Sequence, residues 1–218
     1  MGLNLPPTVK AYLIVVGAVA MLRLAELVIS ARNRRAMIRE GAVPIPERNF
    51  RWMALLHAAI LAGAAIEVVW LRRPFLPMLA APALVCLVLA TWTRWWVIQT
   101  LGHLWNVGIM DSTRQGVADT GPYRWVRHPN YVAVFVELLA LPLVHTAWIT
   151  AALGTTAHVF VLRARIAAED RVLLANPAYV ARMGAKPRFL PTRPTRPTRP
   201  TRPTRPTRPT ETEGLRRK

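Results

Sequence analysis

Four long apolar stretches restrict what this chain can fold into. They run over Ala11–Ile29, Trp52–Leu71, Leu76–Ile98 and Val132–Leu162. Each of the first three is long enough to cross about 30 Å of hydrocarbon at about 1.5 Å per residue. The fourth is too long for one crossing and is interrupted at Pro142, where proline removes a backbone donor and breaks the helix. The sequence predicts an all-α integral membrane protein with about five transmembrane helices, the last two forming a hairpin of short arms.

Composition supports this class. The chain is 53% hydrophobic and still carries a formal net charge of +18. These two properties conflict in a soluble domain and agree in a small membrane protein with basic loops. The single cysteine, Cys86, lies inside an apolar run, so no disulfide framework and no thiolate metal cluster is expected. The five histidines are scattered singly, and no metal site is predicted.

Arginine counting predicts the orientation. The loop after the first stretch is rich in arginine, whereas the amino terminus offers only Lys10. The positive-inside rule places that loop in the cytoplasm and the amino terminus outside. Gln99–Asn130 and everything after Leu162 then also lie in the cytoplasm. We therefore expect an integral protein of the bacterial inner membrane whose polar, motif-bearing regions face the cytoplasm.

The chain divides into three segments. Residues 1–98 hold three helices and a basic loop, 99–191 hold the polar motifs, and 192–218 form a Pro-Thr-Arg repeat tail. Proline at every third position favours an extended, disordered polyproline II tail. Its arginines could bind anionic lipid headgroups or, without specificity, nucleic acid. Slippage in a repetitive coding sequence, with no role, is the favoured interpretation, and nucleic acid is not an expected partner.

Several common catalytic motifs are absent from the sequence. It contains no glycine-rich phosphate loop, no HExxH, no GxSxG and no strand followed by GxGxxG and a helix. These absences argue against a nucleotide-binding P-loop enzyme, a zinc protease of that type, a serine hydrolase and a dinucleotide-dependent dehydrogenase.

The densest functional signal is the segment Gly121–Tyr131, which reads GPYRWVRHPNY. It places two tyrosines, a tryptophan, two arginines, a histidine and two prolines directly before an apolar stretch. An interfacial anchor with a proline helix start is one explanation, but an anchor needs fewer such residues. Downstream, Arg165 and Glu169 are four residues apart and share one helix face, as an ordinary exposed ion pair also would.

Together these segments resemble the isoprenylcysteine carboxyl methyltransferase and phospholipid methyltransferase superfamily. The similarity rests on Gly121–Tyr131, Glu137, Arg165–Asp170, Tyr179 and Leu190-Pro191, and it covers roughly residues 99 to 191. Members are integral membrane enzymes that use S-adenosylmethionine. The variant with HPNYxAVxxEL is similar to the bacterial, alkylpyrone methyltransferase-like branch. This sequence departs from the pattern at Ala133, where many members have glycine, and at Arg182, which replaces a tyrosine.

The resemblance implies a cytoplasmic cofactor pocket and assigns residues to it. Cofactor binding is expected from Gln99, Tyr123, Arg127, His128, Pro129, Tyr131 and Glu169. Arg165 would lie where methyl donor and acceptor meet, with Glu169 as the second catalytic residue. For the substrate we expect His57, Glu67 and Glu137. His57 and Glu67 are ionisable residues inside an apolar stretch, where such groups tend to face a cavity, although helix packing alone would also explain them.

The expected reaction is transfer of a methyl group from S-adenosylmethionine to a carboxylate or acidic hydroxyl of a lipophilic small molecule. An alkylpyrone, alkylresorcinol or prenylcysteine type of acceptor would suit it, and membrane lipids are expected partners. Two alternatives stay open: N-methylation of a phospholipid amine, and a non-enzymatic small transporter or scaffold. The sequence does not determine the oligomeric state.

Overall fold

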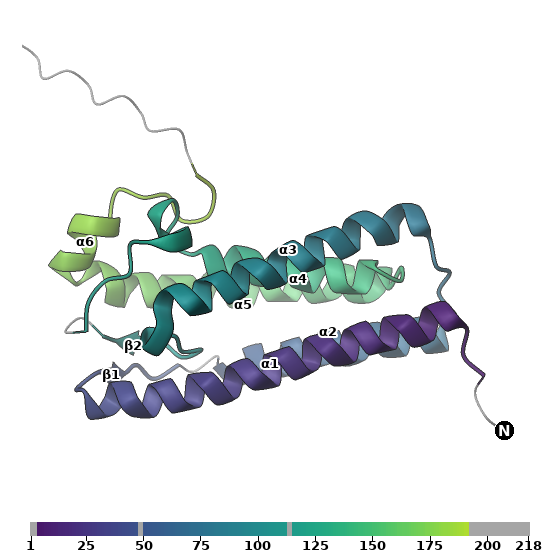
Figure 1. Cartoon of the computed structure of the whole chain (residues 1–218), viewed down its shortest axis with the longest axis horizontal. Coiled ribbons are helices and arrows are strands. Elements are labelled where there is room, and N and C mark those ends of the chain that lie inside the picture. The colour runs from purple at the N-terminus through teal and green to yellow at the C-terminus, as the bar shows by residue number, and fades with distance from the viewer. Residues whose placement is uncertain (1–3, 48–49, 113–114, 192–218) are drawn as a thin grey trace, which may run out of the picture.

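The protein is described by a computed structural model that covers residues 4–47, 50–112 and 115–191. The predictions for the Pro-Thr-Arg tail lie outside the described residues. The described chain is mostly helical (Figure 1). Its long helices are α1 (Pro7–Arg39), α2 (Phe50–Trp70), α3 (Pro77–Leu101), α4 (Pro129–Leu143) and α5 (Trp148–Leu174). Shorter elements are β1 (Val43–Pro44), β2 (Met110–Asp111), α6 (Pro177–Met183) and 3-10 turns at Gly102–Leu104 and Gly121–Arg124.

Helices α1, α2 and α3 are long and apolar enough to cross a membrane. They contain 33, 21 and 25 residues and cover the three apolar stretches seen in the sequence to within one residue. Helix α4 is apolar as well but has only 15 residues. The class of all-α membrane protein is therefore supported, while five crossings stay a prediction.

The predicted hairpin is present in α4 and α5. Pro142 lies in the last turn of α4, and the connection at 144–147 includes Thr146 with a positive φ of 55°. The second arm, however, is not short. Helix α5 runs for 27 residues, past Leu162, because no proline or glycine follows to end it before Leu174. Arg165 and Glu169 therefore lie on the second arm of the hairpin itself rather than on a separate helix after it.

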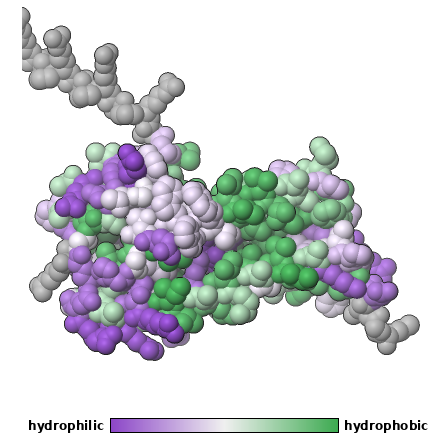
Figure 2. Space-filling view, viewed as in Figure 1, coloured by the Kyte–Doolittle hydropathy of each residue, from purple (hydrophilic) through white to green (hydrophobic). Residues whose placement is uncertain are grey.

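The polar loops gather at one end of the molecule, which we call the motif end. Val43 of β1 pairs with Asp111 of β2, so the loop after α1 meets the loop after α3. Helix α6 lies at this end too, opposite the amino terminus (Figure 1). Figure 2 shows hydrophobic side chains across the middle of the visible face and hydrophilic ones gathered mainly toward the two ends. The two motif-bearing regions thus lie together, as expected, and the side of the membrane they face stays a prediction.

The opposite end, which we call the far end, is closely packed. Buried side chains from α1, α2, α3 and α4, including Tyr12, Val68, Leu87 and Leu141, form one hydrophobic cluster there. Thr146 Oγ1 donates a 2.6 Å hydrogen bond to the carbonyl of Pro74 and so ties the hairpin turn to the connection between α2 and α3. This packing holds the helices together at the far end, while at the motif end they enclose a cavity.

Candidate functional site

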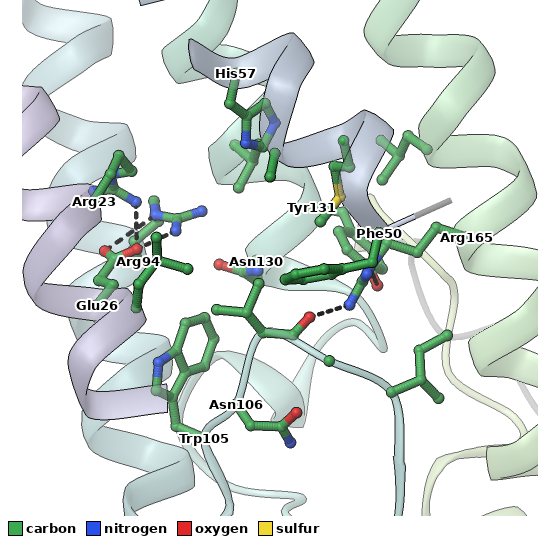
Figure 3. Close-up of a pocket in the computed structure, with 18 of the residues that line it drawn as sticks. Arg23, Glu26, Phe50, His57, Arg94, Trp105, Asn106, Asn130, Tyr131 and Arg165 are labelled. Carbon is green, nitrogen blue, oxygen red and sulfur yellow. Dashed lines mark hydrogen bonds and ion pairs between the residues drawn. The ribbon is translucent and has the colours of Figure 1, made fainter. Parts of the chain in front are cut away.

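A cavity of about 650 Å³ extends from the motif end into the apolar part of the bundle. One wall comes from α1 and α2 and is apolar except for Arg23, Glu26 and His57, with small residues such as Ala54, Ala58 and Ala62 leaving room along α2. The other walls come from the loop after α3, the start of α4 and one face of α5. Its volume falls within the about 300–1,000 Å³ typical of small-molecule sites. Figure 3 shows polar side chains from several helices converging on this space.

The loop Gly121–Tyr131 is held in place by backbone contacts at both ends. Gly121 has a positive φ of 52°, and a side chain there would collide with Thr100 of α3. The backbone N–H groups of Arg127 and His128 donate 2.9 Å hydrogen bonds to the carbonyls of Pro187 and Arg188. The carboxyl-terminal segment therefore straps the loop, and both the proline-rich sequence and this strap make the loop rigid.

Asp170 of α5 anchors the same loop through its side chain. Its carboxylate lies 2.9 Å from His128 Nε2, 2.8 Å from Arg188 Nη2 and 3.5 Å from Arg127 Nη1. Sequence reasoning quoted Asp170 within a motif but gave it no role. One ring nitrogen of His128 is therefore occupied by this anchor, although His128 still lines the cavity.

Arg165 is fixed from three sides inside the cavity. Its Nε donates to Tyr131 Oη at 2.9 Å, its Nη1 pairs with the carboxylate of Glu47, and its Nη2 donates to the carbonyl of Val107. Glu47 also accepts a hydrogen bond from the backbone of Ile109. The sequence analysis missed Glu47, which lies 118 positions from Arg165 and in no recognisable motif. The contacts show a buried, positioned arginine rather than an exposed helical ion pair.

Tyr131 connects the two predicted catalytic residues. Its hydroxyl accepts from Arg165 and donates to the carboxylate of Glu169. Tyr123 and Tyr179 also line the cavity near Glu169. Burial, followed by the nearby Glu169 carboxylate, raises the pKa of Tyr123. Burial also raises the pKa of Tyr179 to about 12, so both tyrosines stay neutral hydroxyl donors at neutral pH.

A cluster of four charged residues lies beside the cavity, inside the bundle. Arg94 of α3 pairs with Glu26 of α1, and Arg23 lies 2.7 Å from Glu26 and 3.5 Å from Glu137 of α4. Arg23, Glu26 and Arg94 line the cavity, as Figure 3 shows, whereas Glu137 is not part of its lining. Two arginines and two glutamates balance in charge, which makes their burial in an apolar region tolerable.

The structure brings most of the expected site residues together, but not all of them. The cavity is lined by His57, Tyr123, Arg127, His128, Tyr131, Arg165 and Glu169. Gln99 is exposed on the last turn of α3, outside the cavity lining. Pro129 is buried as the first residue of α4, where it begins the helix rather than lining the cavity. Glu137 belongs to the charged cluster, as described above.

Glu67 lies at the far end and caps helix α5. Its carboxylate accepts hydrogen bonds from the backbone N–H groups of Ile149, at 3.1 Å, and Thr150, at 2.7 Å. Arg73 Nη2 lies 2.7 Å from the same carboxylate. A negative charge at a helix amino terminus is favourable for that helix. Glu67 was expected at the substrate together with His57, but it lies about 15 Å along α2 from His57 and does not line the cavity.

Unpartnered polar atoms show where a ligand would find hydrogen bonds. Asn106 Oδ1, Asn130 Oδ1, Trp105 Nε1 and Arg127 Nε are buried and have no hydrogen-bond partner among the described residues. All four residues line the cavity. Buried polar atoms in native proteins are nearly always paired, so these two acceptors and two donors indicate a polar ligand at the motif end.

Comparison with known proteins shows which family this region is similar to. The sequence model of the isoprenylcysteine carboxyl methyltransferase family matches residues 83–175. The predicted resemblance to this family is confirmed over these residues. The matched region includes the loop Gly121–Tyr131 together with Arg165 and Glu169, whereas Glu47 and His57 lie outside it. The similarity to this family and the three apolar helices are what a membrane methyltransferase would show.

Two bacterial relatives extend the similarity beyond the family match. The uncharacterized protein YpbQ of Bacillus subtilis is 29% identical over 152 residues, which cover 69% of this chain and 89% of the relative. An uncharacterized protein of Haemophilus influenzae is also 29% identical, over 153 residues that cover 70% of this chain and 88% of the relative. The chain therefore spans most of the length of both relatives.

Proposed function

We propose that the protein is an S-adenosylmethionine-dependent methyltransferase that methylates a carboxylate or acidic hydroxyl of a lipophilic small molecule. One observation carries the proposal. Arg165 and Glu169 face a cavity that is polar and aromatic at the motif end and apolar between α1 and α2. Such a cavity suits a polar methyl donor at one end and a lipophilic acceptor at the other.

The residues at the motif end fit the proposed cofactor. S-adenosylmethionine carries an ammonium, a carboxylate, a ribose and an adenine, and when bound it supplies a methyl group on a sulfonium. Glu169 and the unpartnered Asn130 Oδ1 are acceptors for cationic or hydroxyl groups. Arg127 Nε and Trp105 Nε1 are unpartnered donors for an anionic or ring acceptor. Aromatic faces, such as that of Tyr131, favour cations and adenine rings.

Arg165 retains donors for an anionic acceptor. A guanidinium has five N–H groups, and the contacts to Tyr131, Glu47 and Val107 use three of them. The remaining donors match the planar geometry of a carboxylate or enolate oxygen pair. An acceptor that is already anionic needs no strong general base, so positioning is the main contribution of Arg165.

The apolar wall supports a lipophilic acceptor that arrives from the membrane. Leu24 and Leu27 of α1 line the cavity and are 55% and 45% exposed. Ala54, Ala58 and Ala62 of α2 line it as well and are also exposed. The cavity therefore reaches the lipid-facing surface between α1 and α2. Lateral access keeps the reacting groups away from water, which strengthens the contacts of Arg165 and Glu169 with their ligands.

We further propose that the motif end faces the cytoplasm of a bacterial cell, where S-adenosylmethionine is available. Support comes from the arginines near the carboxyl end of α1 (Arg32, Arg34, Arg35 and Arg39) and from the pairing of β1 with β2, which places both polar loops at this end. Reporter fusions after Pro191 should report the cytoplasm, and a fusion at the amino terminus should report the outside. The reverse result would place the site on the other side.

Methyl transfer to defined acceptors tests the reaction. Purified protein in detergent is incubated with S-adenosylmethionine labelled in its methyl group and with three acceptor classes: long-chain carboxylic acids, alkyl-substituted acidic phenols or pyrones, and phosphatidylethanolamine. Label in an ester or ether supports the proposal. Label only in the phospholipid amine supports N-methylation instead. A folded protein that labels none of the three classes contradicts the proposal.

A further inference from the structure

Two histidines meet in the cavity, deep in the apolar part of the bundle. The rings of His57 on α2 and His158 on α5 have centroids 5.2 Å apart and are tilted by 40°. Both residues line the cavity, and His158 is only 1% exposed. Figure 3 shows His57 projecting from its helix toward the space that Arg94, Asn130 and Tyr131 also face. This pair lies apart from the motif loop and from the contacts of Arg165.

Three ring nitrogens of this pair lack hydrogen-bond partners in the part of the chain that the structure describes. His57 Nε2 and both His158 Nδ1 and Nε2 are buried without a hydrogen-bond partner within residues 4–47, 50–112 and 115–191. A neutral imidazole offers one donor and one acceptor. Leaving such groups unpaired is costly, above all where hydrocarbon rather than water surrounds the bundle. An oxygen atom of a ligand in the cavity would satisfy one nitrogen of each ring.

The position of His158 relative to Arg165 sets the size of that ligand. The two residues are seven positions apart on α5, which is close to two turns, so they share one face and lie about 10 Å apart along the helix axis. Leu162 lies between them and lines the cavity as well. A molecule with its anionic group at Arg165 and its chain along Leu162 would therefore reach the histidine pair about 10 Å from that group.

His145 shows that unpartnered nitrogens alone do not make a site. It is also 1% exposed and has both ring nitrogens unpartnered among the described residues. It contacts the rings of Tyr12 and Phe75 at the far end, however, and does not line the cavity. A metal ion is not favoured either, since the described residues contain no group of three or more histidine, cysteine, aspartate or glutamate side chains able to hold one.

We infer that His57 and His158 form a polar subsite that selects acceptors carrying a hydroxyl or carbonyl oxygen about 10 Å from the methylated group. The inference rests on the proposed function, because Arg165 defines where the anionic group of the acceptor lies. It names a substrate class: an oxygenated, rather than a plain, long-chain acid or acidic phenol. The apolar wall accommodates the alkyl chain of the acceptor, and the histidine pair forms hydrogen bonds with its oxygen.

The test compares two probes that differ by one oxygen. Purified full-length protein is titrated calorimetrically with hexadecanoic acid and with the same acid bearing a hydroxyl near the middle of the chain. We expect the hydroxy acid to bind about tenfold more tightly, which is the ratio that one net hydrogen bond supplies. In His158→Phe this ratio should fall to about one. His145→Phe is the matched control, with the same substitution at an equally buried histidine outside the cavity, and should keep the ratio.

Binding and turnover separate the two proposals. Equal affinity for both acids in the wild type overturns the subsite, and so does failure of the hydroxy acid to bind. A preference that survives in His158→Phe overturns it too, and His57→Leu decides the question should His158→Phe not fold. If the preference depends on the histidines but labelled methyl groups never reach either acid, the subsite stands and methylation of such acids by this protein is ruled out.

Discussion

The two ends of this bundle use buried charge in opposite ways. At the far end, Glu67 is saturated: its carboxylate holds the first N–H groups of α5 and pairs with Arg73, beside a closely packed cluster. At the motif end, Arg165 and Glu169 face a cavity of about 650 Å³ with polar groups left over. A saturated charge stabilises the fold, whereas a positioned charge with free donors or acceptors suits a ligand. Substitutions at the far end should therefore lower stability, whereas substitutions at the motif end should lower turnover or ligand affinity.

The largest effect is expected at Arg165. Arg165→Lys keeps the charge but loses the planar fork that Glu47, Val107 and the acceptor share, so the acceptor is misplaced. Turnover should fall by about 100-fold with the affinity for S-adenosylmethionine nearly unchanged. Steady-state kinetics and calorimetric titration measure the two quantities. Arg163→Lys, at an exposed position of the same helix, is the control, and near-wild-type turnover in Arg165→Lys would remove Arg165 from catalysis.

A smaller, cofactor-specific effect is expected at Glu169. Glu169→Gln keeps the shape and a hydrogen bond with Tyr131 but removes the charge that would face the cofactor's cationic groups. The apparent constant for S-adenosylmethionine should rise by about tenfold, the usual consequence of losing one charge-assisted hydrogen bond. Initial rates at varied cofactor concentration measure it. Glu40→Gln, an exposed carboxylate at the same end, should leave the constant alone. An unchanged constant in Glu169→Gln would show that this carboxylate does not bind the cofactor.

The smallest kinetic effect is expected at the far end. Glu67→Gln removes the charge that caps α5 and leaves Arg73 without its partner. The loss should cost about 1–2 kcal/mol and lower the melting temperature in detergent by a few degrees, with turnover unchanged. Thermal denaturation and kinetics on the same preparation measure both. Reduced turnover at unchanged stability would mean that the far end takes part in the reaction after all.

Local sequence patterns predicted the helices of this fold better than they predicted where the helices end and which residues meet in space. The apolar runs and Pro142 located α1 to α4 and the hairpin, because both hydrophobic length and proline act locally on the backbone. The fourth apolar stretch ended at Leu162, where charged residues begin, but α5 continues to Leu174 because no proline or glycine ends the helix there. Glu67 was expected at the substrate with His57 because both are ionisable residues in one apolar stretch. In the structure Glu67 lies near the far end of α2.

Site residues that lie in contiguous motifs could be predicted from the sequence, whereas contacts between distant segments could not. The resemblance assigned roles to Tyr131, Arg165 and Glu169, and the structure brings all three together. Glu47 reaches Arg165 across 118 positions, and Arg94 reaches Glu26 across 68, so no local spacing reveals either pair. Arg94 did carry a usable signal, because an arginine inside an apolar stretch seeks a buried partner.

Binding of S-adenosylmethionine tests the central claim most directly. Calorimetric titration of the purified full-length protein should show saturable binding of one molecule per chain. In His128→Ala the affinity should fall while the protein stays folded, because His128 ties the motif loop to Asp170 outside the apolar core. The far-end variant Glu67→Gln should bind as the wild type does. Absence of saturable binding to folded wild-type protein would contradict the account of the cavity as a methyl-donor site.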